Sequence, residues 1–206
     1  KKGVYYRGIV KGDYTSVATF NFFDNEVNGL FANSTYANVI IGKTEINNPN
    51  SDYIIFSVFK LKINNEFNCG FKDDEQMKVN IAEPSNQRNA QSTRCVTMYF
   101  EIDNNLYTSN GSSTTQTTNW MTSVFNNVQT LFSNDAITTS LKSLFIWTTQ
   151  DPYEGIGTSS SAYLFKFNEV RPVFNGDVGQ LVGIDPGGLG GVAVNINGLC
   201  SQDNFS

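Results

Sequence analysis

The 206-residue sequence contains no histidine. It therefore supplies no imidazole to bind zinc or to act as a general acid or base. Charge is also scarce: 16% of the residues are charged and the net charge is -5, which argues against nucleic acid as a partner. No apolar run approaches eighteen residues, so we expect no membrane insertion. The chain opens Lys1-Lys2-Gly3 without an initiator Met or a signal segment, and we expect a processed or excised chain.

What the sequence does contain is enough apolar material for a core, with 39% hydrophobic and 13% aromatic residues. Many Asn, Ser and Thr residues accompany the few charges, as on many exported proteins, so we expect a secreted or cell-surface location. The three cysteines, Cys69, Cys95 and Cys200, cannot all pair within one chain. One thiol is therefore free or pairs outside the chain.

The apolar pattern changes near residue 70. Before it, short alternating runs separated by turn residues predict strands over 16–22, 27–31, 36–41 and 53–59. We expect residues 1–70 to form a small antiparallel, β-rich segment. Residues 71–94 are polar and predict a linker.

After Cys95 the periodicity alternates between two and about 3.6, which is typical of strands interleaved with helices. The pattern predicts strands over 96–102, 141–147 and 192–196, with a short amphipathic run over 177–184 before the last of them. Helices are expected over 120–132, where an apolar stripe should pack on a sheet, and over 159–168. The fold class is therefore mixed α+β, with strand-helix-strand-helix-strand order in residues 95–206.

Four blocks of this second part, residues 99–107, 141–147, 175–185 and 191–200, carry a family resemblance. In order and spacing over about 110 residues they resemble the opening half of the reprolysin (adamalysin-like, M12B-type) zinc metallopeptidases, and the secreted bacterial type looks closest. Residues 1–70 resemble the β-rich prodomain of the same enzymes. The resemblance divides the chain into a prodomain-like segment over 1–70, a linker over 71–94, and the N-terminal subdomain of a catalytic domain over 95–206.

The resemblance implies a zinc endopeptidase whose catalytic helix, His-Glu-x-x-His-x-x-Gly-x-x-His, is absent from this sequence. Catalytic zinc needs three protein ligands, a water and a general base, so we expect no catalytic residue here and no zinc bound by this chain alone. Zinc and an extended peptide substrate are implied for the full-length parent. The implied partner of this chain is the missing C-terminal half of the catalytic domain, or a second copy through self-association.

Individual residues take roles from the same resemblance. Cys69 falls near the place where the family has a thiolate that caps zinc in the zymogen; the alternative is a half-cystine or a buried thiol. Asp177 matches a calcium ligand of some reprolysins, but the glutamate that those proteins use on the first strand is Thr97 here. Calcium is therefore doubtful, and the alternative is a helix N-cap or a surface acid.

The last block matches the upper rim of the family's active-site cleft, which pairs with extended substrate through its backbone. The matching residues are Gly191, Val192, Ala193, Val194 and Asn195. The alternative is an ordinary edge strand of a sheet. Cys200 matches the family cysteine at the end of this strand, and Cys95 is a candidate partner for it, which would leave Cys69 free. On the chain-entropy model such a disulfide contributes about 4 kcal/mol.

Three hypotheses follow. The first is the N-terminal portion of a secreted zinc-dependent metalloendopeptidase, inactive without the zinc ligands. The second is a non-enzymatic binding or surface-assembly protein on a peptidase-like scaffold. The third is a β-rich module unrelated to peptidases. The carboxylates of Asp151, Glu154 and Glu169 are expected in turns or on solvated faces, because nothing in their spacing brings them together.

Overall fold

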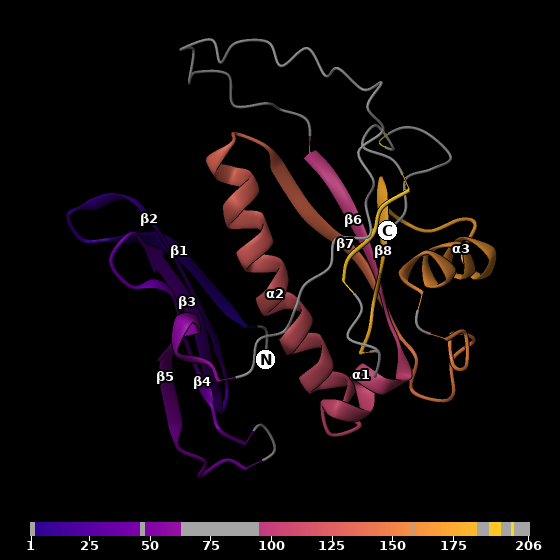
Figure 1. Cartoon of the computed structure of the whole chain (residues 1–206), viewed down its shortest axis with the longest axis horizontal. Helices are drawn as coiled ribbons and strands as arrows, with labels where there is room; N and C mark the ends of the chain where they lie inside the picture. The colour runs from indigo at the N-terminus through magenta and orange to yellow at the C-terminus, as the bar shows by residue number, and fades with distance from the viewer. Residues whose placement is uncertain are drawn as a thin grey trace. The chain divides into compact units, whose positions relative to one another are not determined.

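A computed structural model describes residues 3–45, 48–62, 95–157, 159–184, 190–194 and 199. These residues form two compact units (Figure 1). The first contains the described residues up to 62 together with Leu106–Phe132, and the second contains residues 95–105 and the described residues from 133 onward. Because a boundary between the units falls inside the short helix α1 (Asn104–Ser109), each unit is described by itself.

The first unit is built on an antiparallel sheet in the order β1-β2-β3-β4-β5. Its strands are β1 (Val4–Val10), β2 (Asp13–Phe23), β3 (Glu26–Asn33), β4 (Ala37–Lys43) and β5 (Tyr53–Ser57), followed by the 3-10 turn η1 (Val58–Lys60). Consecutive strands are neighbours throughout, as short turns require. The β-rich, antiparallel character expected from the alternating runs is confirmed.

Helix α2 (Thr114–Asn134) belongs to the same unit and contacts the sheet through polar side chains. Arg7 Nε donates to Asn126 Oδ1 at 2.9 Å, and Asn126 Nδ2 donates to Asn21 Oδ1 at 2.8 Å. The sequence instead predicted an apolar stripe against a sheet. Met121 and Phe125 of that stripe are buried and Leu131 is 58% exposed, so part of the stripe is covered, and the hydrogen bonds to this sheet come from polar residues of the helix.

The second unit contains a parallel sheet in the order β7-β6-β8. Its elements are β6 (Cys95–Ile102), β7 (Thr138–Ile146), β8 (Val178–Val182) and helix α3 (Ser160–Val170). Helix α3 begins with the Ser159 side chain accepting from the backbone N–H of Ala162, and it ends just before Pro172, as predicted. The strand-helix-strand-helix-strand order is confirmed.

Among the described residues, however, the last strand is β8, and residues 192–194 of the predicted strand over 192–196 form no strand. Val178–Val182 pair in parallel with Met98–Ile102, so the run interpreted as amphipathic contains a strand of this sheet. Residues 191–194 belong to no strand, and residues 195–198 lie outside the described residues. The apolar alternation at 192–194 arises because this segment packs against a core without pairing to a described strand.

That core lies between the parallel sheet and α3. Its buried members are Tyr99, Tyr153, Leu164 and Phe167, and Val192 and Val194 are among the half-buried residues packed against them. Within the part of the chain that the structure describes, no helix is long and apolar enough to cross a membrane.

Candidate functional site

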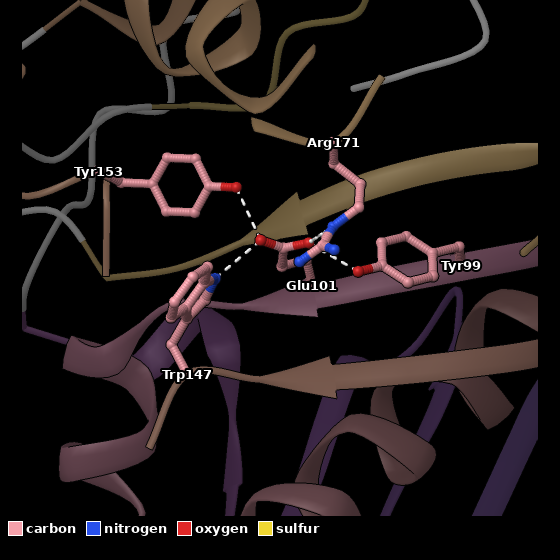
Figure 2. A network of polar contacts seen from close by, with 5 residues as sticks. All are labelled: Tyr99, Glu101, Trp147, Tyr153 and Arg171. Atoms are coloured by element: carbon pink, nitrogen blue, oxygen red, sulfur yellow. Dashed lines mark hydrogen bonds and ion pairs between the residues drawn. The ribbon is translucent and has the colours of Figure 1, made fainter. Parts of the chain in front are cut away.

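The most buried ionisable group of the second unit is the carboxylate of Glu101 on β6, whose side chain has no exposed surface. Four donors converge on it (Figure 2). Oε2 accepts from Tyr99 Oη at 2.6 Å and from Arg171 Nε at 2.7 Å, and Oε1 accepts from Trp147 Nε1 at 2.7 Å and from Tyr153 Oη at 2.8 Å. Each oxygen therefore has two hydrogen bonds, which compensates the cost of burying the charge.

These partners come from different elements, so the carboxylate ties the unit together. Tyr99 shares the Glu101 face of β6, Trp147 follows β7 directly, Tyr153 lies in the next loop, and Arg171 follows α3 directly. Removal of the carboxylate would leave all four donors without their acceptor. The network is therefore a positioning device rather than a reactive group.

Electrostatics supports this interpretation. Burial alone would raise the pKa of Glu101 above its ordinary value of 4.5, but the hydrogen bonds, led by that of Arg171, outweigh burial and lower the pKa. Burial, followed by the hydrogen bond to Glu101, raises the pKa of Tyr99 and of Tyr153 above 10.0. At neutral pH the carboxylate is thus charged and both phenols are neutral donors.

A pocket of about 260 Å³ lies beside this network. Tyr163 and Leu164 of α3, residues 180–183 at the end of β8, and residues 190–192 are among the groups that line it. Asp103 also lines the pocket, and its Oδ2 accepts from the backbone N–H of Ile184 at 3.1 Å. An added Cβ at Gly183 would lie 2.0 Å from that oxygen, so only glycine fits where the chain leaves β8.

Two of the predicted rim residues, Gly191 and Val192, therefore border a pocket. Val192 and Val194 are half-buried against the core, whereas Gly191 and Ala193 are exposed. This alternation is that of an extended segment with one face on the protein and the other in solvent. Asn195 lies outside the described residues.

The two residues at the family's calcium positions are brought together. Asp177 Oδ2 accepts from the backbone N–H of Thr97 at 2.8 Å and from the Thr97 hydroxyl at 2.7 Å, and these hydrogen bonds, the backbone one first, lower the pKa of Asp177. Asp177 N donates to Thr97 O at 2.8 Å. Asp177 is exposed, so it is a surface acid, one of the alternatives expected from sequence, and its carboxylate joins the start of β8 to β6.

The three other acids considered in the sequence, Asp151, Glu154 and Glu169, have separate hydrogen-bond partners. Asp151 accepts from the backbone N–H groups of Tyr153 and Asn104, at 2.8 and 2.7 Å, and is buried in its turn. Glu154 accepts from Gln150, and Glu169 pairs with Lys166 at 3.0 Å. No acid–base pair forms among the three acids.

Of the three cysteines, only Cys95 lies in the part of the chain that the structure describes. Cys95 is exposed and forms no disulfide with another described residue, whereas Cys69 and Cys200 lie outside the described residues, so the Cys95–Cys200 disulfide stays a prediction. Across the described ranges, no three His, Cys, Asp or Glu side chains stand close enough together to hold a metal ion. These residues do not fit a catalytic zinc.

The family is shown by comparison with known sequences. A model of the reprolysin (M12B) family of zinc metalloproteases matches residues 94–203, more than half of the chain. The chain belongs to this family. A search of curated proteins gives no match.

Glu101 is the site residue that sequence reasoning did not single out. A signal was present, because a glutamate interrupts the otherwise apolar strand over 96–102. A charge in the buried half of a strand requires partners, and aromatic hydroxyls and Arg171 were available to provide them.

Proposed function

We propose that this chain forms the prodomain and the N-terminal part of the catalytic domain of a secreted, zinc-dependent metalloendopeptidase. The family match supports hydrolysis of peptide bonds as the activity of the parent. The zinc ligands are not among these residues, since the sequence contains no histidine. They come from other polypeptide of the same enzyme.

The observation that carries the proposal is the extended segment over residues 190–194. Gly191 and Val192 line the pocket, Gly191 and Ala193 are exposed, and Val192 and Val194 pack against the core. Such a segment offers backbone N–H and C=O groups to an extended peptide, which is the usual basis of sequence-tolerant peptide binding. This chain would bind and align substrate and would itself transfer no proton.

The edge strand β8 of the parallel sheet supports the proposal that the catalytic domain contains further polypeptide. Among the described strands, β8 is one of the two outer strands in the order β7-β6-β8, and residues 180–183 line the pocket. An open edge of a parallel sheet exposes unpaired backbone groups, and parallel sheets are normally covered. Further polypeptide that extends or covers this edge would complete the domain.

The first test is the mass of the protein purified from its native source. A mass well above the 22.8 kDa of this chain, with peptides that continue into a His-Glu-x-x-His helix, is the expected result. A native protein without such a helix would instead support the alternative, a binding or surface-assembly protein on a peptidase-like scaffold.

The rim is tested in the native enzyme with two substitutions at one position. Ala193→Pro removes a backbone N–H, and Ala193→Gly keeps it. We expect kcat/KM for a peptide substrate to fall about tenfold or more in the proline variant, as for one lost hydrogen bond in a water-excluded site, and to change little in the glycine variant. If the two variants have equal activities, the backbone N–H of residue 193 does not bind the substrate.

Cys69 is proposed to cap the zinc of the latent enzyme. A thiolate is a strong zinc ligand, so its loss should open the fourth coordination position. Cys69→Ser in the unprocessed enzyme should raise its activity before proteolysis. Unchanged latency would favour the half-cystine or buried-thiol alternative.

A further inference from the structure

Helix α2 carries a stripe of polar side chains along one side. Its members are Gln116, Asn119, Ser123, Asn126 and Thr130, which follow one another at intervals of three and four residues and therefore share a face. None of them is exposed, and Ser123, Asn126 and Thr130 are at most 7% exposed. Polar side chains are buried at little cost only where they have hydrogen-bond partners. The partners of this stripe therefore indicate what this side of the helix contacts.

The C-terminal part of the stripe has its partners. The hydroxyls of Ser123 and Thr130 donate to the backbone carbonyls of Asn119 and Asn126, each at 2.8 Å. The side chain of Asn126 accepts from Arg7 of the sheet and donates to Asn21 of the sheet. This part of the helix is thus matched to the sheet without a further group.

The hydrogen bonds of Asn126 continue across the sheet to a carboxylate. Asn21 Nδ2 donates to Asn28 Oδ1 at 2.8 Å, and Asn28 Nδ2 donates to Glu26 Oε1 at 2.8 Å. All bonds of this chain run in one direction, from the guanidinium of Arg7 to the carboxylate of Glu26. Successive amides polarise one another, and the last N–H group stabilises the negative charge of Glu26. Within the described part of the chain, no basic side chain forms an ion pair with Glu26.

Glu26 borders a pocket of about 420 Å³ that lies within the first unit. Asp24 and Glu26 line it from the sheet, and Gln116 and Asn119 of the polar stripe line it from α2. Among the described residues, neither of these two amide side chains hydrogen-bonds to the sheet. The polar stripe therefore continues into the pocket, but there it lacks the partners that Asn126 has.

The pocket is short of hydrogen-bond donors. Gln116 Oε1 has almost no exposed surface and no donor. The last torsion of a glutamine side chain is soft, so a small rotation can turn this oxygen toward a ligand in the pocket that Gln116 lines. Lys43 also lines the pocket, but its Nζ donates to the backbone carbonyls of Asn48 and Pro49 at 3.1 and 3.2 Å. A ligand that donates hydrogen bonds would satisfy the acceptors that remain.

We propose that this pocket binds an organic cation, whose ammonium or guanidinium group lies between Glu26 of the sheet and Gln116 of α2. An ammonium group has three N–H donors and a guanidinium group has five, so either can reach both acceptors at once. The positive charge pairs with Glu26, and the exposed carboxylate of Asp24 attracts the same charge to the pocket. This inference concerns the first unit alone and does not depend on the proposed peptidase function.

Butylammonium and butanol are matched probes, because they share an alkyl chain and differ in charge. Titration of the full chain at constant ionic strength, followed by the backbone amide NMR signals of Asn25 and Gln116, measures their binding. We expect butylammonium to shift these signals saturably and butanol to bind about tenfold or more weakly, since it cannot form a charge-assisted hydrogen bond.

Two glutamates provide a matched pair of substitutions. Glu26→Gln removes the charge but keeps an oxygen for the Asn28 amide, and it should weaken butylammonium binding about tenfold or more. Glu45→Gln is the control, because Glu45 also accepts from an asparagine amide, that of Asn48 at 3.1 Å, and does not line the pocket. It should leave the affinity unchanged, and circular dichroism checks that both variants are folded.

Gln116→Met separates binding from stability. It removes a buried acceptor that has no donor, so the melting temperature of the free protein should rise, whereas the affinity for butylammonium should fall about fivefold. A purely structural role of Gln116 would change the first quantity and not the second.

A lysine side chain and a free amine carry the same group, and a blocked Gly-Lys-Gly peptide distinguishes them. Binding of the peptide about tenfold more tightly than butylammonium would identify a polypeptide as the source of the cation, and equal affinities would identify a small amine. Three results would overturn the proposal: no saturable shift with butylammonium or the peptide, equal binding of butylammonium and butanol, or equal effects of Glu26→Gln and Glu45→Gln.

Discussion

Arg171 Nε lies 2.7 Å from Oε2 of Glu101, and this ion pair joins the residue after α3 to the central strand of the parallel sheet. The guanidinium also lies 4.8 Å from the ring centroid of Phe145 on β7. Arg171 therefore contacts two of the three strands of this sheet, β6 and β7. A buried pair of this kind is valuable mainly because its loss leaves the other charge unpaired.

The first prediction concerns that pair. Glu101→Gln should destabilise the second unit by about 3 kcal/mol, because Arg171 loses its counter-charge and one accepting oxygen becomes a donor. Fluorescence of Trp147, whose indole N–H binds Glu101, can follow unfolding in a Trp120→Phe background. Glu169→Gln, which breaks an exposed pair with Lys166, is the control and should cost less than about 1 kcal/mol. Similar losses in the two variants would contradict the role of burial.

The second prediction concerns pH. Because the folded protein lowers the pKa of Glu101 below 4.5, its contribution to stability is present above 4.5 and is lost as pH falls through the lowered pKa. The difference in unfolding free energy between the wild type and Glu101→Gln should therefore be constant near neutral pH and should shrink below about pH 4.5. Urea titrations over an acid series measure it. A difference that does not vary with pH would show that folding leaves the pKa of Glu101 unchanged.

Much of the fold could be predicted because its sequence signals are local. Alternating runs predicted β2 to β5, and the turn and proline signals predicted the ends of α3. The position of the last strand could not be predicted in this way. Residues 178–182 and 192–196 are both short runs that contain apolar residues, and the choice between them depends on the distant partner β6.

The candidate site was predictable only in part for the same reason. The rim residues came from a contiguous block of resemblance, whereas the Glu101 network joins residues up to 70 positions apart. The periodicity of apolar residues indicates which side chains are buried, but it does not indicate which distant residues they contact. The polar contact of α2 with the sheet was missed because an apolar stripe dominates the helix, although Asn126 and Arg7 carry the observed contacts.

The third prediction concerns Thr97 and Asp177, which match the calcium-binding positions of some reprolysins and are hydrogen-bonded to each other here. Thr97→Glu would place a second carboxylate beside Asp177, where the family resemblance puts a glutamate. Two carboxylates and nearby carbonyls are the donors that calcium prefers, so the variant's melting temperature should rise with millimolar calcium. The wild type should show no such rise. Thr97→Glu combined with Asp177→Asn should lose the response, and a calcium response that survives in this double variant would place the ion elsewhere.

The fourth prediction concerns the polar contact between α2 and the antiparallel sheet. Asn126 is 2% exposed and bridges Arg7 and Asn21, and Asn21 Nδ2 in turn donates to Asn28 Oδ1 at 2.8 Å. Asn126→Ala should cost about 1–3 kcal/mol, since it leaves the buried oxygen of Asn21 without its donor from α2. Asn134→Ala, at the exposed end of the same helix, should change stability by less than about 0.5 kcal/mol.

A double-mutant cycle separates this hydrogen bond from a general loss of packing. Asn21→Ala and Asn126→Ala each remove one partner, so the double variant should cost less than the sum of the single variants by about 0.5 kcal/mol or more. Thermal unfolding followed by circular dichroism measures the three differences. Additive effects would mean that the two amides act independently, and the attachment of α2 to the sheet would then rest on its apolar contacts.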